Sequence, residues 1–225
     1  MKAIVLFSGG LDSTTLLAMC VKEFGAENII ALSLYYGQKH SREIRSAEEV
    51  VKYYGVEHIQ LNVAEIFKDS DCTLLEGRGE IPEESYADQL KKINGKPVST
   101  YVPFRNGLFL SIATSMAIAK ECEIICYGAH ADDAAGNAYP DCSTAFLNFM
   151  NGAVYEGSGR SVTIRAPFIE KTKKDIVAEG IRLNVPYELT WSCYEGGEKP
   201  CGKCGTCIDR VKAFEANGIK DPLRY

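Results

Sequence analysis

The 225-residue sequence lacks a long hydrophobic run and has no excess of positive charge. It contains no stretch of about 18 apolar residues, so we expect no segment that spans a membrane. Lysine and arginine total 25 against 30 aspartate and glutamate residues, which gives a net charge of −5. Because non-specific nucleic-acid binding depends on basic surfaces, we expect no nucleic-acid partner.

The chain also has little sequence ahead of its first apolar stretch, which begins at Ala3. A secretory signal would not fit there, so we expect a cytoplasmic protein. Nine cysteines in such a protein do not predict a disulfide framework, since disulfides are rare in the cytosol. The cysteines therefore predict small buried side chains or a metal site.

A glycine-rich turn near the N-terminus has no lysine, and so it is not a Walker A motif. Residues 3–7 are predicted to form a buried strand and residues 11–24 a helix, with Gly9 and Gly10 between them. In an open α/β sheet, phosphate groups bind at this kind of junction. An ordinary turn with a serine or aspartate cap is the alternative.

Apolar stretches alternate with helical patterns along the chain, which predicts a Rossmann-like parallel sheet with helices on both faces. The predicted strands are residues 3–7, 29–35, 58–62, 124–128 and 162–165. The predicted helices are residues 11–24, 41–54, 105–121, 143–155, 173–183 and 207–217. We expect an α/β domain over residues 1–186, with an irregular insertion at about 69–100, and a C-terminal appendage over residues 187–225.

Polar segments follow the later strands, and the carboxyl ends of parallel strands meet around one crevice. The candidates there for contacts to a nucleotide or substrate are Gln38, His40, Arg105, Asn106, His130, Asp132, Asp133, Tyr139 and Asp141. Lys171 and Lys174 follow the fifth strand and are predicted to neutralise phosphates that the first loop cannot. Ordinary structural roles are the alternatives. Asp132 or Asp141 would cap a helix, Arg105 would form a surface salt bridge, and the lysines would be solvated.

Four cysteines cluster near the C-terminus, where Cys201, Cys204 and Cys207 are spaced Cys-x2-Cys-x2-Cys and Cys193 lies upstream. Four thiolates suit tetrahedral zinc, and such a site is structural because no coordination position stays open. An iron–sulfur cluster and a redox-active cysteine pair are the alternatives. The sequence thus predicts a small zinc knuckle.

Taken together, these motifs resemble the QueC family of 7-cyano-7-deazaguanine synthases, within the ATP pyrophosphatase (PP-loop) superfamily. The resemblance extends from Phe7 to Cys207. It implies an adenine nucleotide alpha hydrolase-like fold and an ATP-dependent carbon–nitrogen ligase of queuosine biosynthesis. The implied reaction converts 7-carboxy-7-deazaguanine and ammonia to 7-cyano-7-deazaguanine through carboxylate adenylation. The implied metals are one structural Zn²⁺ per chain and Mg²⁺ with ATP, and we expect a homodimer.

The resemblance also implies roles for individual residues. The catalytic residues are Asp12, which orients magnesium, Lys171, Lys174 and Arg105. The ATP-binding residues are Ser8, Gly9, Gly10, Leu11, Asp12, Ser13, Thr14, Thr15, Leu16, Leu17 and Ala18. Rival interpretations are a tRNA thiolase, NAD synthetase or GMP synthetase of the same superfamily, and a non-catalytic zinc-stabilised nucleotide sensor.

Overall fold

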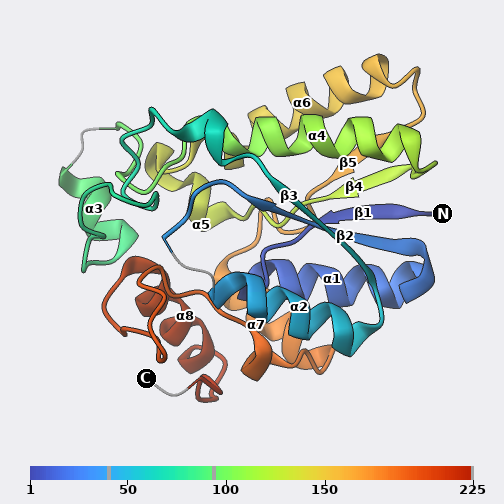
Figure 1. Ribbon diagram of the computed structural model, residues 1–225. Helices are drawn as coiled ribbons and strands as arrows, with labels where there is room; N and C mark the ends of the chain where they lie inside the picture. The colour runs from blue at the N-terminus through green and yellow to red at the C-terminus, as the bar shows by residue number, and fades with distance from the viewer. Residues whose placement is uncertain (40–41, 93–94, 224–225) are drawn as a thin grey trace.

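The computed structural model describes residues 1–39, 42–92 and 95–223, and its centre is a parallel five-stranded sheet (Figure 1). The strands are β1 Ala3–Leu6, β2 Ile29–Tyr35, β3 Glu57–Asn62, β4 Ile124–Cys126 and β5 Thr163–Arg165. They lie in the order β3-β2-β1-β4-β5, and each neighbouring pair is parallel. The predicted sheet is therefore confirmed.

Helices cover both faces of the sheet. They are α1 Leu11–Phe24, α2 Arg42–Tyr54, α3 Tyr86–Lys92, α4 Arg105–Ala119, α5 Ala131–Ala134, α6 Thr144–Gly157, α7 Lys173–Arg182 and α8 Gly205–Glu215. Helices α1, α2 and α7 lie on one face, and α4 and α6 lie on the other (Figure 1). The predicted Rossmann-like α/β fold is confirmed, with α3 inside the expected insertion at about 69–100 and α5 as a helix that the sequence did not predict.

Both faces of β1 are buried, which explains why its sequence is apolar without alternation. Ala3 and Val5 pack into the core with α1 and α7, whereas Ile4 packs into the core with α4. The chain runs from β1 outward to β2 and β3, and then returns to place β4 on the other side of β1. This reversal opens a crevice at the carboxyl ends of β1 and β4, where ligands bind in open α/β sheets.

The C-terminal segment shares a core with the sheet domain. Phe214 of α8 is fully buried and packs edge-on against Tyr187, with ring centroids 5.1 Å apart. Arg210 is also buried, where it pairs with Asp221 through two contacts of 2.7 and 3.0 Å and donates to Thr190 Oγ1 at 2.8 Å. These contacts hold the segment after α7 against α8.

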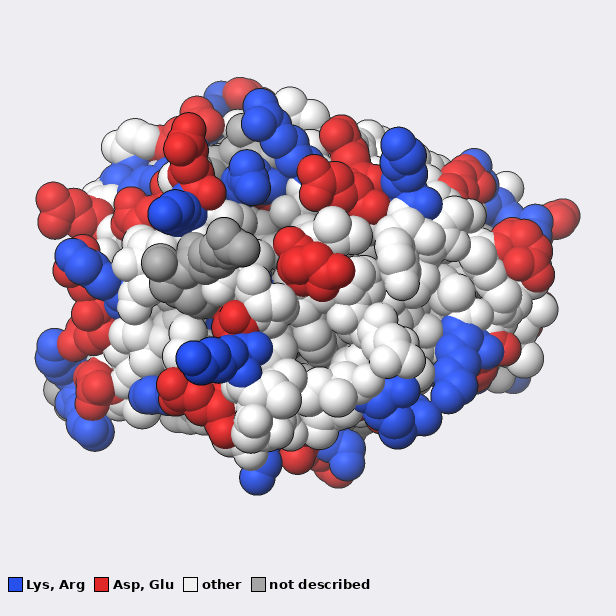
Figure 2. Space-filling view, turned by 90° about the horizontal axis from the view of Figure 1, so that it is seen from below, with Lys and Arg blue, Asp and Glu red and all other residues white. Residues whose placement is uncertain are grey.

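Charges of both signs lie on the face shown in Figure 2. Basic and acidic side chains are interspersed there, and an acidic side chain lies in the otherwise largely uncharged centre. Charge is thus not segregated by sign on this face, in keeping with the small net charge of −5. Among the described residues, no helix combines the length and apolar character needed to cross a membrane.

Candidate functional site

The glycine-rich turn joins β1 to α1 and packs closely on α2. Gly9 has φ +82°, and a Cβ atom there would lie 2.5 Å from the backbone nitrogen of Ala47. Ser8 N donates to Ser13 Oγ at 3.3 Å, and Ser13 Oγ donates to the Gly10 carbonyl at 3.3 Å. Since the N-cap is Gly10, no side chain caps the helix, and the first amides of α1 stay available to an anion.

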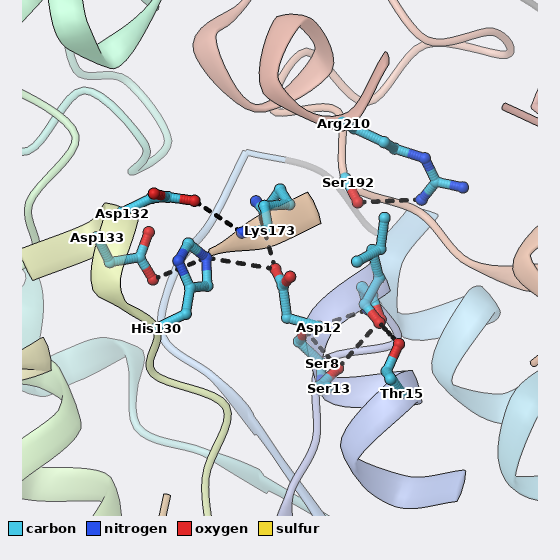
Figure 3. Close-up of polar contacts among 12 residues, drawn as sticks. Ser8, Asp12, Ser13, Thr15, His130, Asp132, Asp133, Lys173, Ser192 and Arg210 are labelled. Carbon is cyan, nitrogen blue, oxygen red and sulfur yellow. Dashed lines mark hydrogen bonds and ion pairs between the residues drawn. The ribbon is translucent and has the colours of Figure 1, made fainter. Parts of the chain in front are cut away.

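Asp12, in the first turn of α1, lies beside two groups from other elements (Figure 3). Its Oδ2 atom lies 3.4 Å from Nζ of Lys173 and 3.8 Å from Nε2 of His130. His130 Nε2 also lies 3.3 Å from Oδ2 of Asp133. The side chains of β1–α1, β4–α5 and β5–α7 thus converge at the switch point of the sheet.

Charge complementarity fixes the ionisation of the Asp12–Lys173 pair. Burial opposes the charge of Asp12, but Lys173 and His130 outweigh it and hold the pKa of Asp12 below its usual value. Burial likewise opposes the charge of Lys173, yet Asp12 and Asp133 raise the pKa of Lys173. A carboxylate and an ammonium group therefore face the end of the glycine-rich turn at neutral pH.

Lys173 is held in place by the segment that precedes α7. Its backbone N donates to Asp132 Oδ2 at 2.7 Å, and Thr172 and Asp175 form a capping box at the start of the helix. Lys173 is buried, whereas the side chains of Lys171 and Lys174 are exposed. The sequence pointed to Lys171 and Lys174, but the lysine that meets Asp12 is Lys173.

Two polar atoms of this group are buried without a hydrogen-bond partner in the described part of the chain: Asp12 Oδ1 and His130 Nδ1. An unpaired carboxylate oxygen beside an anion-binding helix terminus is the kind of ligand that Mg²⁺ takes together with substrate phosphates. Asp12 therefore fits the magnesium role expected from the sequence.

A cavity of about 260 Å³ opens in front of these groups. Its walls carry, beside polar and charged groups, the aromatic rings of Phe7, Tyr35, Tyr36, Tyr86, Phe109, Tyr127, Trp191 and Tyr194. Aromatic and apolar side chains with a few convergent polar groups are typical of a ligand-binding pocket. Tyr86 and Tyr194 close one side, since their hydroxyl oxygens are 2.7 Å apart.

The structure brings most of the predicted site residues to this cavity. The predicted residues that line it are Ser8, Gly10, Leu11, Asp12, Ser13, Gln38, Arg105, Asn106, His130 and Asp133. Among the other ATP-loop candidates, Gly9 lies behind the turn, and Thr14, Thr15, Leu16, Leu17 and Ala18 are buried in α1. His40 lies outside the described residues.

Three predicted substrate contacts have other partners. Asp141 Oδ2 accepts from the backbone N of Asn106 at 2.9 Å, at the start of α4. Tyr139 is buried, with its hydroxyl 2.6 Å from Thr100 Oγ1. Asp132 accepts from the first amide of α7. These three side chains, like those of Lys171 and Lys174, are not part of the cavity wall.

The predicted metal ligands come together. The Sγ atoms of Cys193, Cys201, Cys204 and Cys207 all lie within 4.8 Å of one another. Backbone amides point at the sulfurs, since Cys201 N lies 3.3 Å from Cys193 Sγ and Cys204 N lies 3.3 Å from Cys201 Sγ. Such amides stabilise thiolates, so this donor set fits a metal ion.

The cysteine cluster is connected to the glycine-rich turn through Trp191. The indole Nε1 donates to the Cys193 carbonyl at 2.9 Å, and Trp191 N donates to the Gly9 carbonyl at 3.0 Å. The indole itself lines the cavity. A metal held by the cysteines would therefore order one wall of the candidate site.

Comparisons with known proteins identify the family of the chain. The family described as "Queuosine biosynthesis protein QueC" matches residues 2–218. The 7-cyano-7-deazaguanine synthase of Archaeoglobus fulgidus is 44% identical over 99% of this chain and 90% of its own. The synthase of Caldicellulosiruptor saccharolyticus is 41% identical over 100% and 96%, and that of Thermoplasma acidophilum is 43% identical over 100% and 92%.

Among solved structures, the fold resembles that of the U34-tRNA thiolase NcsA from Methanococcus maripaludis with its 4Fe-4S cluster. The TM-score is 0.53 at 16% identity, over 96% of this chain and 66% of that one, so the similarity concerns the fold alone. The family match and the identities above decide the classification. The chain belongs to the QueC family of queuosine biosynthesis proteins.

Proposed function

We propose that this protein is an ATP-dependent carbon–nitrogen ligase that converts 7-carboxy-7-deazaguanine and ammonia to 7-cyano-7-deazaguanine. The observation that carries the proposal is the Asp12–Lys173 pair at the open N-terminus of α1, facing an aromatic cavity. Family membership supports the choice of product, since related proteins are named for this nitrile.

The chemistry explains why ATP is needed. A carboxylate is a poor acyl donor, because its oxygen leaves badly. Attack of the carboxylate on the α-phosphorus of ATP releases pyrophosphate and makes that oxygen part of AMP, which leaves readily. Ammonia then forms the amide and releases AMP and a proton. A second ATP activates the amide oxygen in the same way and again releases pyrophosphate, and loss of AMP, with both protons of the amide nitrogen released over the two steps, gives the nitrile.

The chain's own residues supply positioning and charge. The amides of α1 and the hydroxyls of Ser8 and Ser13 would bind the pyrophosphate group, and Lys173 would neutralise charge on it as it leaves. Asp12 would hold Mg²⁺, which when bound supplies further neutralisation at the phosphates. We propose Lys173 for the role that the sequence assigned to Lys171 or Lys174, since only Lys173 among them lines the cavity.

We also propose that the four cysteines hold one structural zinc ion. Ligands at a Zn–S distance of about 2.3 Å are about 3.8 Å apart in a tetrahedron. Cys201 Sγ and Cys207 Sγ are 4.0 Å apart, and the largest separation in the set is 4.8 Å. These distances favour a single ion, because a multi-iron cluster places its thiolates on different iron atoms.

The cytoplasmic location, the homodimer and the division at residue 187 stay predictions. Light scattering of the purified protein tests the dimer, and limited proteolysis tests the division. The ammonia source is likewise a prediction, which turnover on free ammonium tests.

Isotope exchange between ATP and pyrophosphate tests the adenylation step. We expect exchange that depends on 7-carboxy-7-deazaguanine and is absent with benzoate, a simple aromatic acid. Ammonia is omitted, so that the acyl adenylate can only return to ATP. A nucleotide sensor would bind ATP without exchange, and that result would overturn the proposal.

A further inference from the structure

Two residues of opposite charge line the same cavity without pairing. Glu43 lies in the first turn of α2, and Arg105 begins α4 on the other face of the sheet. Both are within the described residues, and no ion pair of 4.0 Å or less joins them there. Because both line one cavity, a ligand bound in it can contact both side chains.

Glu43 has no internal partner that would explain its position. Within the described part of the chain, its carboxylate makes no hydrogen bond or ion pair. Burial raises the pKa of Glu43 to about 7, although the charge of Arg105 acts in the opposite direction. A carboxyl group in such a wall is costly unless a ligand supplies donors.

The guanidinium of Arg105 likewise has few hydrogen-bond partners among the described residues. Its guanidinium lies over the rings of Tyr36 and Phe109, 5.3 and 5.9 Å from their centroids. Nη1 donates one long hydrogen bond of 3.4 Å to the Tyr36 hydroxyl. A guanidinium carries five N–H donors, so most of its donors have no partner among the described residues.

The signs of the two charges restrict the ligand. An ammonium ion would suit Glu43 but would be repelled by Arg105, and a phosphate would suit Arg105 but would be repelled by Glu43. A neutral edge with adjacent donors and an acceptor satisfies both. The 6-oxo, N1–H and 2-amino groups of a guanine-type ring form such an edge, with one acceptor beside two donors.

We propose that Glu43 and Arg105 together read the guanine edge of the substrate. Glu43 accepts from N1–H and the 2-amino group, and Arg105 donates to the 6-oxo group. The inference rests on the proposed function, because it takes the deazaguanine acid as the substrate. The three aspartates that the sequence offered as substrate contacts have other neighbours, since Asp132 and Asp141 accept from backbone amides and Asp133 lies beside His130.

The test combines a substitution with a change in the ligand. Glu43→Gln keeps the side-chain shape but turns one acceptor into a donor. The matched control is Glu49→Gln, since Glu49 is an exposed glutamate of the same helix and lies outside this cavity. Each protein is assayed with 7-carboxy-7-deazaguanine and with the analogue that lacks the 2-amino group.

Binding is measured separately from turnover. Trp191 is the single tryptophan and lines the cavity, so its fluorescence reports binding of either acid without ATP. The wild-type protein should bind the complete acid at least about tenfold more tightly than the analogue. Glu43→Gln should bring the two affinities within about threefold and raise KM by at least about tenfold, with kcat changed less than KM. Glu49→Gln should behave as wild type.

The outcomes separate this inference from the proposed function. An active wild-type enzyme that binds both acids equally overturns the inference, whatever the variant does, and leaves the ligase assignment intact. A Glu43→Gln variant that melts normally and keeps the full preference also overturns it. Ligand discrimination that depends on Glu43, in a protein that forms no adenylate, supports the inference and overturns the proposed function.

Discussion

The side chains of Lys173 and Asp12 meet at the first turns of two different helices, with Nζ 3.4 Å from Oδ2. The contact joins α7 to the glycine-rich turn across the switch point of the sheet. Each residue holds the other in its charged form, since the pKa of Asp12 is lowered and that of Lys173 is raised. The glycine-rich turn contains no lysine of its own. Lys173, from a distant part of the chain, places an ammonium group beside it.

Replacing Lys173 should damage catalysis, and replacing its neighbour should not. For Lys173→Gln we expect kcat/KM to fall by about a hundredfold or more, the usual cost of losing a charge contact to a transition state. The control is Lys174→Gln at the next position, where the side chain is exposed, and its rate should stay near that of wild type. Steady-state ATP consumption measures both. Equal losses in the two variants would refute the assignment to Lys173.

The buried ion pair of α8 should dominate the stability of the C-terminal segment. Arg210→Met leaves the carboxylate of Asp221 without this partner, which typically costs about 3–5 kcal/mol. Urea unfolding measures the free energy, and Lys212→Met, an exposed change on the same helix, is the control. A loss below about 1 kcal/mol, the range of exposed pairs, would show that the pair is not structurally important.

The cysteine cluster should bind one metal ion and depend on each ligand. Purified protein should contain about one zinc per chain and no iron–sulfur absorption band. Cys204→Ser should lower the zinc content and the melting temperature together. Cys122→Ser, a buried cysteine outside the cluster, should keep its zinc. Iron in place of zinc, or a Cys204→Ser protein that melts as wild type, contradicts the single-ion site.

Glu43 should make folding less favourable as the pH rises. Its folded pKa of about 7 exceeds the ordinary value of 4.5, because burial favours the neutral form. Between these values the folded carboxyl holds a proton that the unfolded one has lost, so stability falls with rising pH.

Glu43→Gln removes that dependence. Its stability relative to wild type should therefore increase between pH 5 and pH 8, by at most about 3 kcal/mol. Urea unfolding at the two pH values measures the change. A constant difference between the two proteins would mean that the Glu43 carboxyl is solvated like an ordinary surface group.

The sequence predicted α1 and β2 at the observed bounds because their limits are chemically marked. Glycines flank α1 at positions 10 and 25, and β2 is an apolar stretch in which Ser33 is the one strongly polar residue. Helix α5 was missed because its four residues are too short to show a helical period. Its acids suggested ligands, whereas Asp132 in fact accepts from the amide of Lys173.

Lys173 and Glu43 can be identified as site residues only from the face of the helix on which each one lies. Three lysines stand close together before and in α7, and residue type does not distinguish them. Lys173 shares the buried face of α7 with Ile176, Val177 and Gly180, a spacing that the sequence already contains. Glu43 similarly precedes Ala47 and Val50 on the buried face of α2. In both helices the spacing of the buried positions places the charged residue on the buried face. The sequence did not indicate this directly, because charged residues are usually exposed.

The most direct test of the central claim is to follow ¹⁵N-labelled ammonium into the product by mass spectrometry, with ATP and 7-carboxy-7-deazaguanine as the other substrates. The account predicts a labelled nitrile, formed through a labelled amide that is itself consumed when supplied with ATP. A labelled amide that accumulates without conversion would contradict the nitrile assignment, and the absence of any labelled product would contradict the ligase itself.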